Sequence, residues 1–217
     1  MKKVLILILI IILPLLFHHV YGQQIKGAVI GGLNATQVDG DEVFGYHKFG
    51  VNVGAAAIIP FSKKFSVGLE NLFNQKGSYR KPIYEVGEDG SYKLKLNYVE
   101  VPVLIHYTDR QTMTFGTGLS WGRLVSVKEW EHGKRIETTT LRGGPYKRDD
   151  VNLLLDFRFS LYKNLKFNFR YAYSVNKIRT RIFLTGEVRN QYNNILTFRL
   201  IWIFNEDPII KKKKNTE

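Results

Sequence analysis

The sequence contains no cysteine in its 217 residues. The chain therefore cannot be a small domain held together by disulfides, and its stability has to come from backbone pairing and side-chain packing. The same absence excludes a lipoprotein signal, which requires a cysteine directly after its apolar run. Beyond residue 22 the sequence also lacks any apolar run long enough for a transmembrane helix.

The first 22 residues are predicted to be a cleaved signal peptide. Lys2 and Lys3 form a positively charged start, residues 4–17 form an apolar run, and Val20 and Gly22 are small residues at the positions that a signal peptidase reads. The apolar run is short for a membrane-spanning helix, so cleavage near Gly22 is favoured over a retained N-terminal anchor. The rest of the chain is then exported.

Acidic residues are scarce: the chain has 19 Asp and Glu and 32 Lys and Arg, which gives a formal net charge of +13. Such an excess raises the question of nucleic-acid binding. Export argues against it, and the charge is spread over loops, alternate strand positions and residues 211–214, without a basic helix or an aromatic stacking platform. We expect the phosphates of outer-membrane lipid and lipopolysaccharide as counter-charges, and no nucleic acid.

Residues 151–174 carry the clearest pattern in the chain, two runs in which apolar and polar residues alternate around a short turn. Alternation with period two is typical of β-strands, and runs of about ten residues can cross a membrane obliquely. Leu154 is the one exception. The apolar set is Val151, Leu153, Leu155, Phe157, Phe159 and Leu161, then Leu165, Phe167, Phe169, Tyr171 and Tyr173.

The same alternation predicts six more strands, and the connections between all eight are alternately long and short. This rhythm indicates an all-β, eight-stranded antiparallel up-and-down transmembrane β-barrel, with long extracellular loops and short periplasmic turns. The predicted strands cover 25–33, 49–59, 65–75, 93–107, 112–127, 151–161, 165–174 and 195–204, and the long loops cover 34–48, 76–91, 128–149 and 175–193. The barrel domain is 23–204, followed by a basic periplasmic tail, 205–217.

One face of the predicted strands is rich in glycine, serine and asparagine and carries charge, while the other is nearly uncharged. Burying unpaired charges in an apolar core costs several kcal/mol each, so the charged face is predicted to line a polar lumen and the apolar face to meet lipid. A soluble, lipocalin-like barrel is the alternative and needs the reverse pattern. The predicted lumen charge network is Glu70, Glu100, Asp156, Arg158, Lys166, Arg170 and Arg199.

Aromatic residues near the strand ends predict the girdles that anchor a barrel at the two membrane interfaces. The predicted girdle is Phe65, Phe73, Tyr107, Trp121, Tyr173, Trp202 and Phe204. Together with the signal peptide, these features predict location in the cell outer membrane.

No catalytic or metal-binding constellation is found. His47, His106 and His132 are scattered without metal-ligand spacing, and are interpreted as loop or interface histidines. Ser120 lies in a Gly-x-Ser-x-Gly sequence, but that motif needs a strand-to-helix elbow and here falls inside a continuous strand pattern. We therefore predict no enzyme, no cofactor and no metal.

Glu70 and Glu100 are the remaining candidates for chemistry, since paired carboxylates act as acid and base in glycosidases. The inward arginines at 158, 170 and 199 can balance them instead. A structural pair inside the lumen is the favoured interpretation.

Several motifs resemble the PorT-like outer-membrane β-barrel family (porin family, outer membrane protein beta-barrel domain). They are Gly32-Leu33-Asn34, Leu69-Glu70-Asn71-Leu72 followed by Gln75-Lys76-Gly77, Asn97-Tyr98-Val99-Glu100-Val101-Pro102, the glycine-rich segment 115–122 and Arg170-Tyr171-Ala172-Tyr173-Ser174. The resemblance implies an eight-stranded barrel in the outer membrane, and the founding member is linked to a protein-secretion system. This chain departs from the family by continuing past Phe204, and Pro102 breaks a ladder bond within a strand, as in the family pattern.

Two classes of function follow from these predictions. The first is a non-enzymatic structural or interaction barrel with a plugged lumen, whose loops meet envelope or secretion-system proteins. The second is a narrow channel or small-solute transporter, since the glycines leave room for a passage. Neither the partner nor the oligomeric state follows from the residues.

Overall fold

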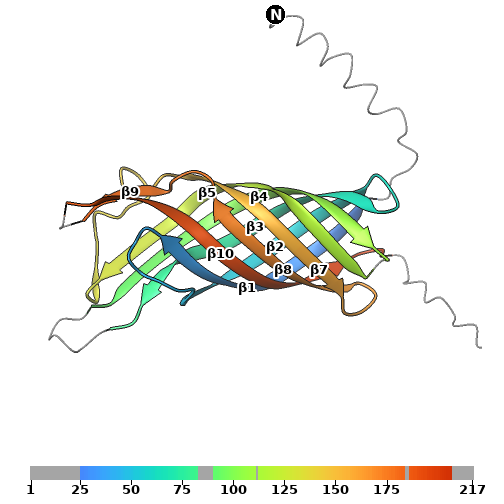
Figure 1. Cartoon of the computed structure of the whole chain (residues 1–217), viewed down its shortest axis with the longest axis horizontal. Helices are drawn as coiled ribbons and strands as arrows, with labels where there is room; N and C mark the ends of the chain where they lie inside the picture. Colours follow the sequence, from blue (N-terminus) through green and yellow to red (C-terminus); the bar gives the residue numbers. More distant parts are fainter. Residues whose placement is uncertain (1–24, 83–89, 111, 184–185, 207–217) are drawn as a thin grey trace, which may run out of the picture.

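The computed structural model describes residues 25–82, 90–110, 112–183 and 186–206 (Figure 1). The predicted signal peptide, 1–22, and all but the first two residues of the predicted tail, 205–217, lie outside these residues. Within the described residues, no helix has the length and apolar character needed to cross a membrane.

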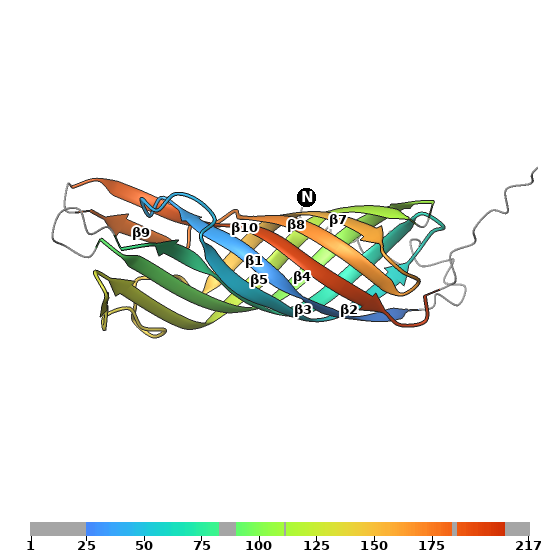
Figure 2. The same cartoon turned by 90° about the horizontal axis from the view of Figure 1, so that it is seen from below.

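The described chain folds into one antiparallel sheet that closes on itself. Neighbouring long strands pair in chain order, and β1 pairs with β10 from Ala28↔Ile203 to Asp39↔Tyr192, which closes the ring (Figure 2). Closure leaves the eight long strands without a free edge. The strands are β1 (Lys26–Asp39), β2 (Lys48–Pro60), β3 (Phe65–Arg80), β4 (Tyr92–Asp109), β5 (Met113–Glu131), β6 (Lys134–Arg135), β7 (Asp149–Ser160), β8 (Leu165–Ser174), β9 (Arg179–Ile182) and β10 (Val188–Ile203).

The two ends of the barrel differ in their connections. At one end, 61–64 and 161–164 form short turns, closed by hydrogen bonds such as that from the amide of Phe61 to the carbonyl of Phe65, 3.1 Å, and only a short connection separates the end of β4 from the start of β5. The chain enters β1 and leaves β10 at this same end (Figure 1). Short turns and both termini face the periplasm in outer-membrane barrels, so we name it the periplasmic end and its opposite the extracellular end.

The strands are longer at the extracellular end than the sequence predicted. Residues 34–39 belong to β1, 76–80 to β3, 128–131 to β5 and 188–193 to β10, so the prediction of loops at these positions is wrong. A tilted strand needs about 9–11 residues to cross a bilayer, whereas β4 has 18 residues and β5 has 19. The barrel wall therefore continues beyond the membrane as an extracellular extension.

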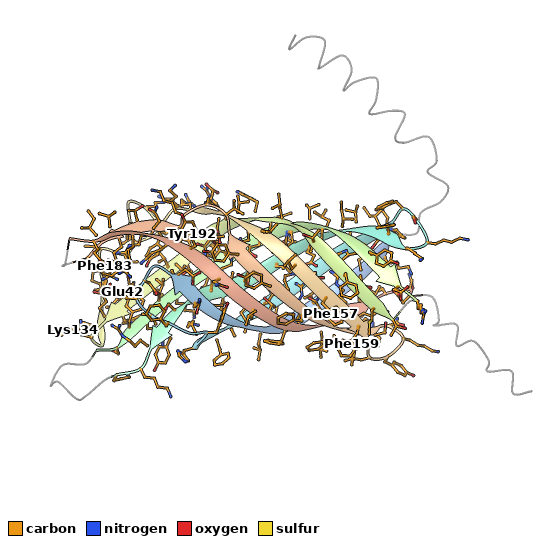
Figure 3. The ribbon with its side chains drawn as sticks, viewed as in Figure 1. Glu42, Lys134, Phe157, Phe159, Phe183 and Tyr192 are labelled. Atoms are coloured by element: carbon orange, nitrogen blue, oxygen red, sulfur yellow. The ribbon has the colours of Figure 1, made fainter. Side chains whose placement is uncertain are left out.

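In the part of the wall nearer the periplasmic end, the apolar face points outward as predicted. Leu155 and Leu200 are 53% and 47% exposed, whereas Arg158 and Arg170 are 5% and 3% exposed. Figure 3 shows Phe157 on the outer surface of this part. A soluble barrel would require the opposite arrangement, so the lipocalin-like alternative is excluded for this part of the wall.

In the extracellular extension the two faces exchange character. Leu94, Leu96 and Tyr98 point inward and are 0% exposed, while Lys93 and Lys95 point outward between them. The inward set forms an apolar core of Val38, Val43, Tyr92, Leu94, Leu96, Tyr98, Leu124, Val127, Tyr146 and Ile178. Outside the membrane the wall meets water, so the hydrophobic effect drives apolar side chains inward, as in a soluble barrel.

A β-bulge in β5 accompanies this exchange. The β4–β5 register shifts between Asn97, opposite Ser126, and Tyr98, opposite Leu124, so Val125 is left unpaired. The extra residue lets Leu124 and Val127 both point inward, which strict alternation would forbid. Strict alternation along β5 would place Ser126 inward, but with the bulge Val127 takes the buried position.

Replacing both Leu94 and Leu96 by alanine tests the core of the extension. Each deletion of a buried leucine costs about 2–5 kcal/mol, and the cost falls on the extension because both side chains belong to its apolar core. We expect faster proteolysis within the extension of the refolded protein, with an intact protected barrel fragment. The matched control is Lys93→Ala with Lys95→Ala on the outer face, and equal proteolysis of the two double variants would contradict the apolar core.

Candidate functional site

A cluster of five ionised side chains lies across the lumen in the membrane-spanning part. The Glu70 carboxylate accepts paired hydrogen bonds from Arg170, at 2.8 and 2.9 Å, and from Arg199, both at 3.1 Å. Arg158 adds a bond of 3.2 Å to Glu70 and one of 2.8 Å to Asp156. The Nε of Arg170 donates to Asp156 at 2.7 Å. The cluster thus joins β3, β7, β8 and β10 across the barrel.

All five of these residues are at most 5% exposed. Removing a charge from water costs several kcal/mol, and only close pairing with good geometry offsets that cost. Each carboxylate here receives bonds from at least two arginines, and bidentate Arg–carboxylate bonds are among the strongest polar contacts in proteins. The cluster therefore favours a single arrangement of four strands.

A second charged layer lies on the extracellular side of the first. Lys76 contacts Glu100 at 2.5 Å and Asp150 at 2.9 Å, and Asn74 donates to Glu100 at 2.7 Å. Ser174 donates to Asp150 at 2.7 Å. Lys76 and Asp150 are 1% and 0% exposed, so this layer is buried as completely as the first.

A row of apolar residues lies between the two charged layers on β4, β5, β7, β8 and β10. Neighbouring strands pair at each position of this row, which consists of Leu104, Gly118, Leu154, Ala172 and Ile195. The side chains of the four residues other than Gly118 form one buried cluster. Leu154, the exception to the alternation of the 151–174 hairpin, lies between the Asn152 and Asp156 positions of β7 and fills this row. Its inward apolar side chain is therefore part of the closure of the lumen.

His106 points into the lumen beside the first charged layer. Its Nε2 lies 3.4 Å from Asp156, and the ring is 1% exposed. A Cβ on Gly68 would lie 2.8 Å from the ring, and one on Gly116 would lie 2.4 Å from it. The two glycines therefore make the space that the imidazole occupies, and interpreting His106 as a loop or interface histidine is wrong.

The periplasmic mouth holds a cavity of about 300 Å³. The Lys166 ammonium donates a hydrogen bond of 2.8 Å to the Ser160 hydroxyl. The Glu206 carboxylate lies 3.5 Å from the Lys166 ammonium and 3.8 Å from the Lys26 ammonium. His106 and Arg158 are among the lining residues that bound the cavity toward the lumen. The opening at this end thus leads to the charged cluster.

The structure separates the seven charges of the predicted network into three places. Glu70, Asp156, Arg158, Arg170 and Arg199 form the first layer, Glu100 belongs to the second, and Lys166 lies at the periplasmic mouth. Sequence reasoning missed Lys76 and Asp150, which were assigned to or beside loops. The period-two alternation could have found both residues. Continued from Glu70 through Asn74, it places Lys76 on the inner face, and continued from Asn152 back along the chain, it places Asp150 there.

The predicted girdle residues lie on the outer wall at two levels. Near the periplasmic end are Phe65, Tyr107, Trp202 and Phe204, and the rings of Phe65 and Tyr107 are 5.3 Å apart. Nearer the extension are Phe73, Trp121 and Tyr173. The ring of Tyr173 stacks on that of Tyr192, with the ring centres 6.1 Å apart. The outer wall carries further aromatic residues that were not included in the predicted girdle. They are Phe115, Phe157, Phe159, Phe167, Phe169 and Phe198.

Glu129 organises the polar part of the extracellular extension. It accepts hydrogen bonds from Thr139 at 2.5 Å, from Tyr92 at 2.8 Å and from Arg179 at 2.8 Å. Burial opposes its charge, but the bond from Thr139 and the Arg179 guanidinium hold the pKa of Glu129 below its usual value. These contacts attach the 132–148 and 175–187 connections to β5.

Asp41 lies at the extracellular end in the 40–47 connection and is 4% exposed. It accepts a hydrogen bond of 2.8 Å from the amide of Val43. Burial raises the pKa of Asp41 to about 6, outweighing the amide bond and the more distant Arg181. It also lines a cavity of about 390 Å³ with Tyr92, Glu131 and Phe183.

The first charged layer predicts a large stability effect. Glu70→Gln leaves three buried arginines with only Asp156, and breaking a buried pair costs about 3–5 kcal/mol. Arg123→Gln breaks the exposed pair with Asp149 and should cost about 1 kcal/mol or less. Urea unfolding of the proteins in phospholipid vesicles, followed by tryptophan fluorescence, measures both. Equal midpoints for the two variants would contradict a structural role for the cluster.

The raised pKa of Asp41 should make the local stability of the 40–47 connection depend on pH. Since its pKa is raised in the folded state, its protonated form stabilises the 40–47 connection, and this contribution is lost as pH rises from about 4 through about 6. We expect hydrogen-exchange protection of the Val43 amide, corrected for intrinsic exchange, to fall between pH 5 and pH 7.5, by about 1 kcal/mol.

The matched variants for this prediction are Asp41→Asn and Glu42→Gln. The first should remove the pH dependence because an amide stays neutral, and the second should retain it because Glu42 is more exposed. Constant protection of the original protein over this pH range would contradict the assignment.

The comparisons with known proteins agree with this architecture. Residues 23–179 match the family described as "Outer membrane protein beta-barrel domain". No curated protein sequence matches the chain.

Three solved structures illustrate the similarity. Neisserial surface protein A (NspA) is 11% identical with a TM-score of 0.49, over 81% of this chain and 96% of that one. Ail, the attachment invasion locus protein of Yersinia pestis, is 13% identical with a TM-score of 0.49, over 83% and 99%. OprG from Pseudomonas aeruginosa is 12% identical with a TM-score of 0.43, over 84% and 97%.

The family match covers well over half of the chain, and the described residues form a closed antiparallel barrel with an apolar outer wall. The protein therefore belongs to the outer membrane protein beta-barrel domain family.

Proposed function

We propose that this protein is a non-enzymatic structural and interaction barrel, closed to solutes, which holds a rigid extension above the outer membrane. The observation that supports this most directly is the pair of buried, fully ion-paired layers across the lumen. Four acids, Glu70, Glu100, Asp150 and Asp156, meet four bases, Lys76, Arg158, Arg170 and Arg199. Side chains fill an eight-stranded barrel when they are this large, so little space remains for a solute.

A narrow channel is the second candidate, favoured by the cavity at the periplasmic mouth. For a solute to pass, the bonds of Glu70 to Arg170 and Arg199 would have to open. Opening would expose several charges that pair only with one another, at a cost of several kcal/mol for each unpaired charge. The closed barrel is therefore the better-supported function.

The extracellular extension supports an interaction role. Its apolar core and the hydrogen bonds of Glu129 give the far end of the barrel a defined shape. The cavity lined by Asp41, Tyr92 and Phe183 opens at this end, and Figure 3 shows Glu42, Lys134 and Phe183 there. A protein of the envelope or of a secretion system is the partner that we propose for this surface, as the PorT-like resemblance suggests. We also propose that the chain is exported with cleavage near Gly22.

Conductance in planar bilayers tests the closed lumen. The refolded protein should give no unitary currents, because the two layers block the lumen. A variant with alanine at Glu70, Arg170 and Arg199 and also at Lys76, Glu100 and Asp150 removes the centres of both layers, three acids and three bases, and should give measurable currents or unstable leaks.

The matched control is Arg123→Ala with Asp149→Ala, which removes a pair on the outside of the wall. It should remain silent. Clear unitary currents from the unmodified protein would favour the channel and contradict the proposal.

A further inference from the structure

Three lysines gather on the outer wall where the apolar band ends and the extension begins. They are Lys93 and Lys95 on β4 and Lys128 on β5, and we call them the lysine belt. Lys93 and Lys128 are exposed, and Lys95 is partly exposed. The belt therefore lies on the outside of the barrel, apart from the lumen and from both cavities.

The strand register places two of these charges directly against each other. Lys95 is the cross-strand partner of Lys128 on one side and of Gly77 on the other, so the β3 position next to it has no side chain. Like charges on directly opposite residues are destabilising. In the next row, Lys93 lies between Tyr79 and Trp130, and its Nζ is 5.4 Å from the centre of the Trp130 ring.

No carboxylate in the described part of the chain forms a salt bridge with the belt. Three acids of β5 and β7 are engaged elsewhere: Glu129 points inward to Arg179, Glu131 pairs with Arg181, and Asp149 pairs with Arg123. Burial, together with the neighbouring charges of Lys95 and Lys93, lowers the pKa of Lys48. Among the described residues, the belt is thus a concentration of positive charge without a salt-bridge partner, unlike Lys76 and Lys166.

The level of the belt along the wall identifies what could neutralise it. Val99, 40% exposed, belongs to the apolar band and pairs with Phe73 and Arg123. Lys95 lies four residues further along β4, which at about 3.3 Å per residue places it about 13 Å of strand beyond Val99. Since the strand is tilted, the height above the apolar band is smaller, and falls within the headgroup layer of a bilayer.

We propose that the lysine belt binds the phosphate groups of phosphorylated glycolipid in the outer leaflet. The proposal rests on the embedding of the barrel in the membrane and adds to it a defined lipid contact on β4 and β5. Ammonium groups at this level would lie beside the lipid phosphates. The phosphates would separate Lys95 from Lys128 electrostatically, and the rings of Tyr79 and Trp130 would lie beside the sugar headgroup, a level at which amphipathic aromatics are favoured. The wall would then hold bound lipid at the base of the extension on the side of β4 and β5.

Lipid binding by the refolded full chain in zwitterionic detergent micelles tests the proposal. The probes are diphosphoryl lipid A, the same lipid without its phosphates, and inorganic phosphate. The protein should bind the diphosphoryl lipid at least about tenfold more tightly than the dephosphorylated lipid, and added salt should weaken this preference. Inorganic phosphate at the same concentration should not compete, because it lacks the acyl chains that hold the headgroup at the wall.

The belt variant is Lys93→Gln, Lys95→Gln, Lys128→Gln, and the control is Lys134→Gln, Lys147→Gln, Lys177→Gln, which removes equal charge from the far end of the extension. The belt variant should lose the preference for phosphorylated lipid, and the control should keep it. Equal preference in both variants would overturn the proposal, as would full competition by inorganic phosphate. Folding of each variant is checked by its resistance to proteolysis. Unitary currents would contradict the closed barrel without affecting this result, so the two failures are distinguishable.

Discussion

Pairing of charges that cannot reach water is the constraint on which the rest of this structure depends. Glu70 and Asp156 each receive bonds from several arginines, and the contributing residues lie on β3, β7, β8 and β10. Because an uncompensated charge in this position costs several kcal/mol, only a register that brings all five residues together is stable. The glycines of the inner face follow from the same need for space: a Cβ on Gly32 would lie 2.3 Å from the Cβ of Arg199, its partner on β10. The same set of paired charges and glycines therefore fixes the strand register of the closed barrel and fills its centre.

The wall of this barrel passes through two environments, and each part follows the physical chemistry of its own. In lipid, apolar side chains cover the outside at no cost and the inside must pair its polar groups. In water, the same strands place Leu94 and Leu96 inside and lysines outside. The bulge at Val125 adjusts β5 where one part meets the other. The extension is therefore a small water-exposed barrel continuous with a membrane barrel, and its apolar core explains why the strands do not end at the membrane surface.

These features fit a protein that works at its surface. The lumen is closed by paired charges and by the row that includes Leu154, whereas the lysine belt on the outer wall forms no salt bridge with a described carboxylate. The lysine belt faces the membrane headgroups, and the cavity near Asp41 faces the exterior. Binding of lipid at the base and of a protein at the top would use different residues of one rigid wall, so neither would require the barrel to change shape.

The sequence by itself determined the class of fold, the strand order and which face meets lipid, because alternation with period two and alternating loop lengths are local properties of the chain. It also identified Glu70, Asp156, Arg158, Arg170 and Arg199 as inward charges. Only the tertiary structure decided which charges meet. Lys76 contacts Asp150 across 74 residues of chain, and Arg199 reaches Glu70 across 129, and no local pattern encodes such distances. The reversal of the two faces above Val99 was also decided there, because a strand keeps period two whether its apolar side meets lipid or a core, and only the surrounding strands and solvent tell the two cases apart.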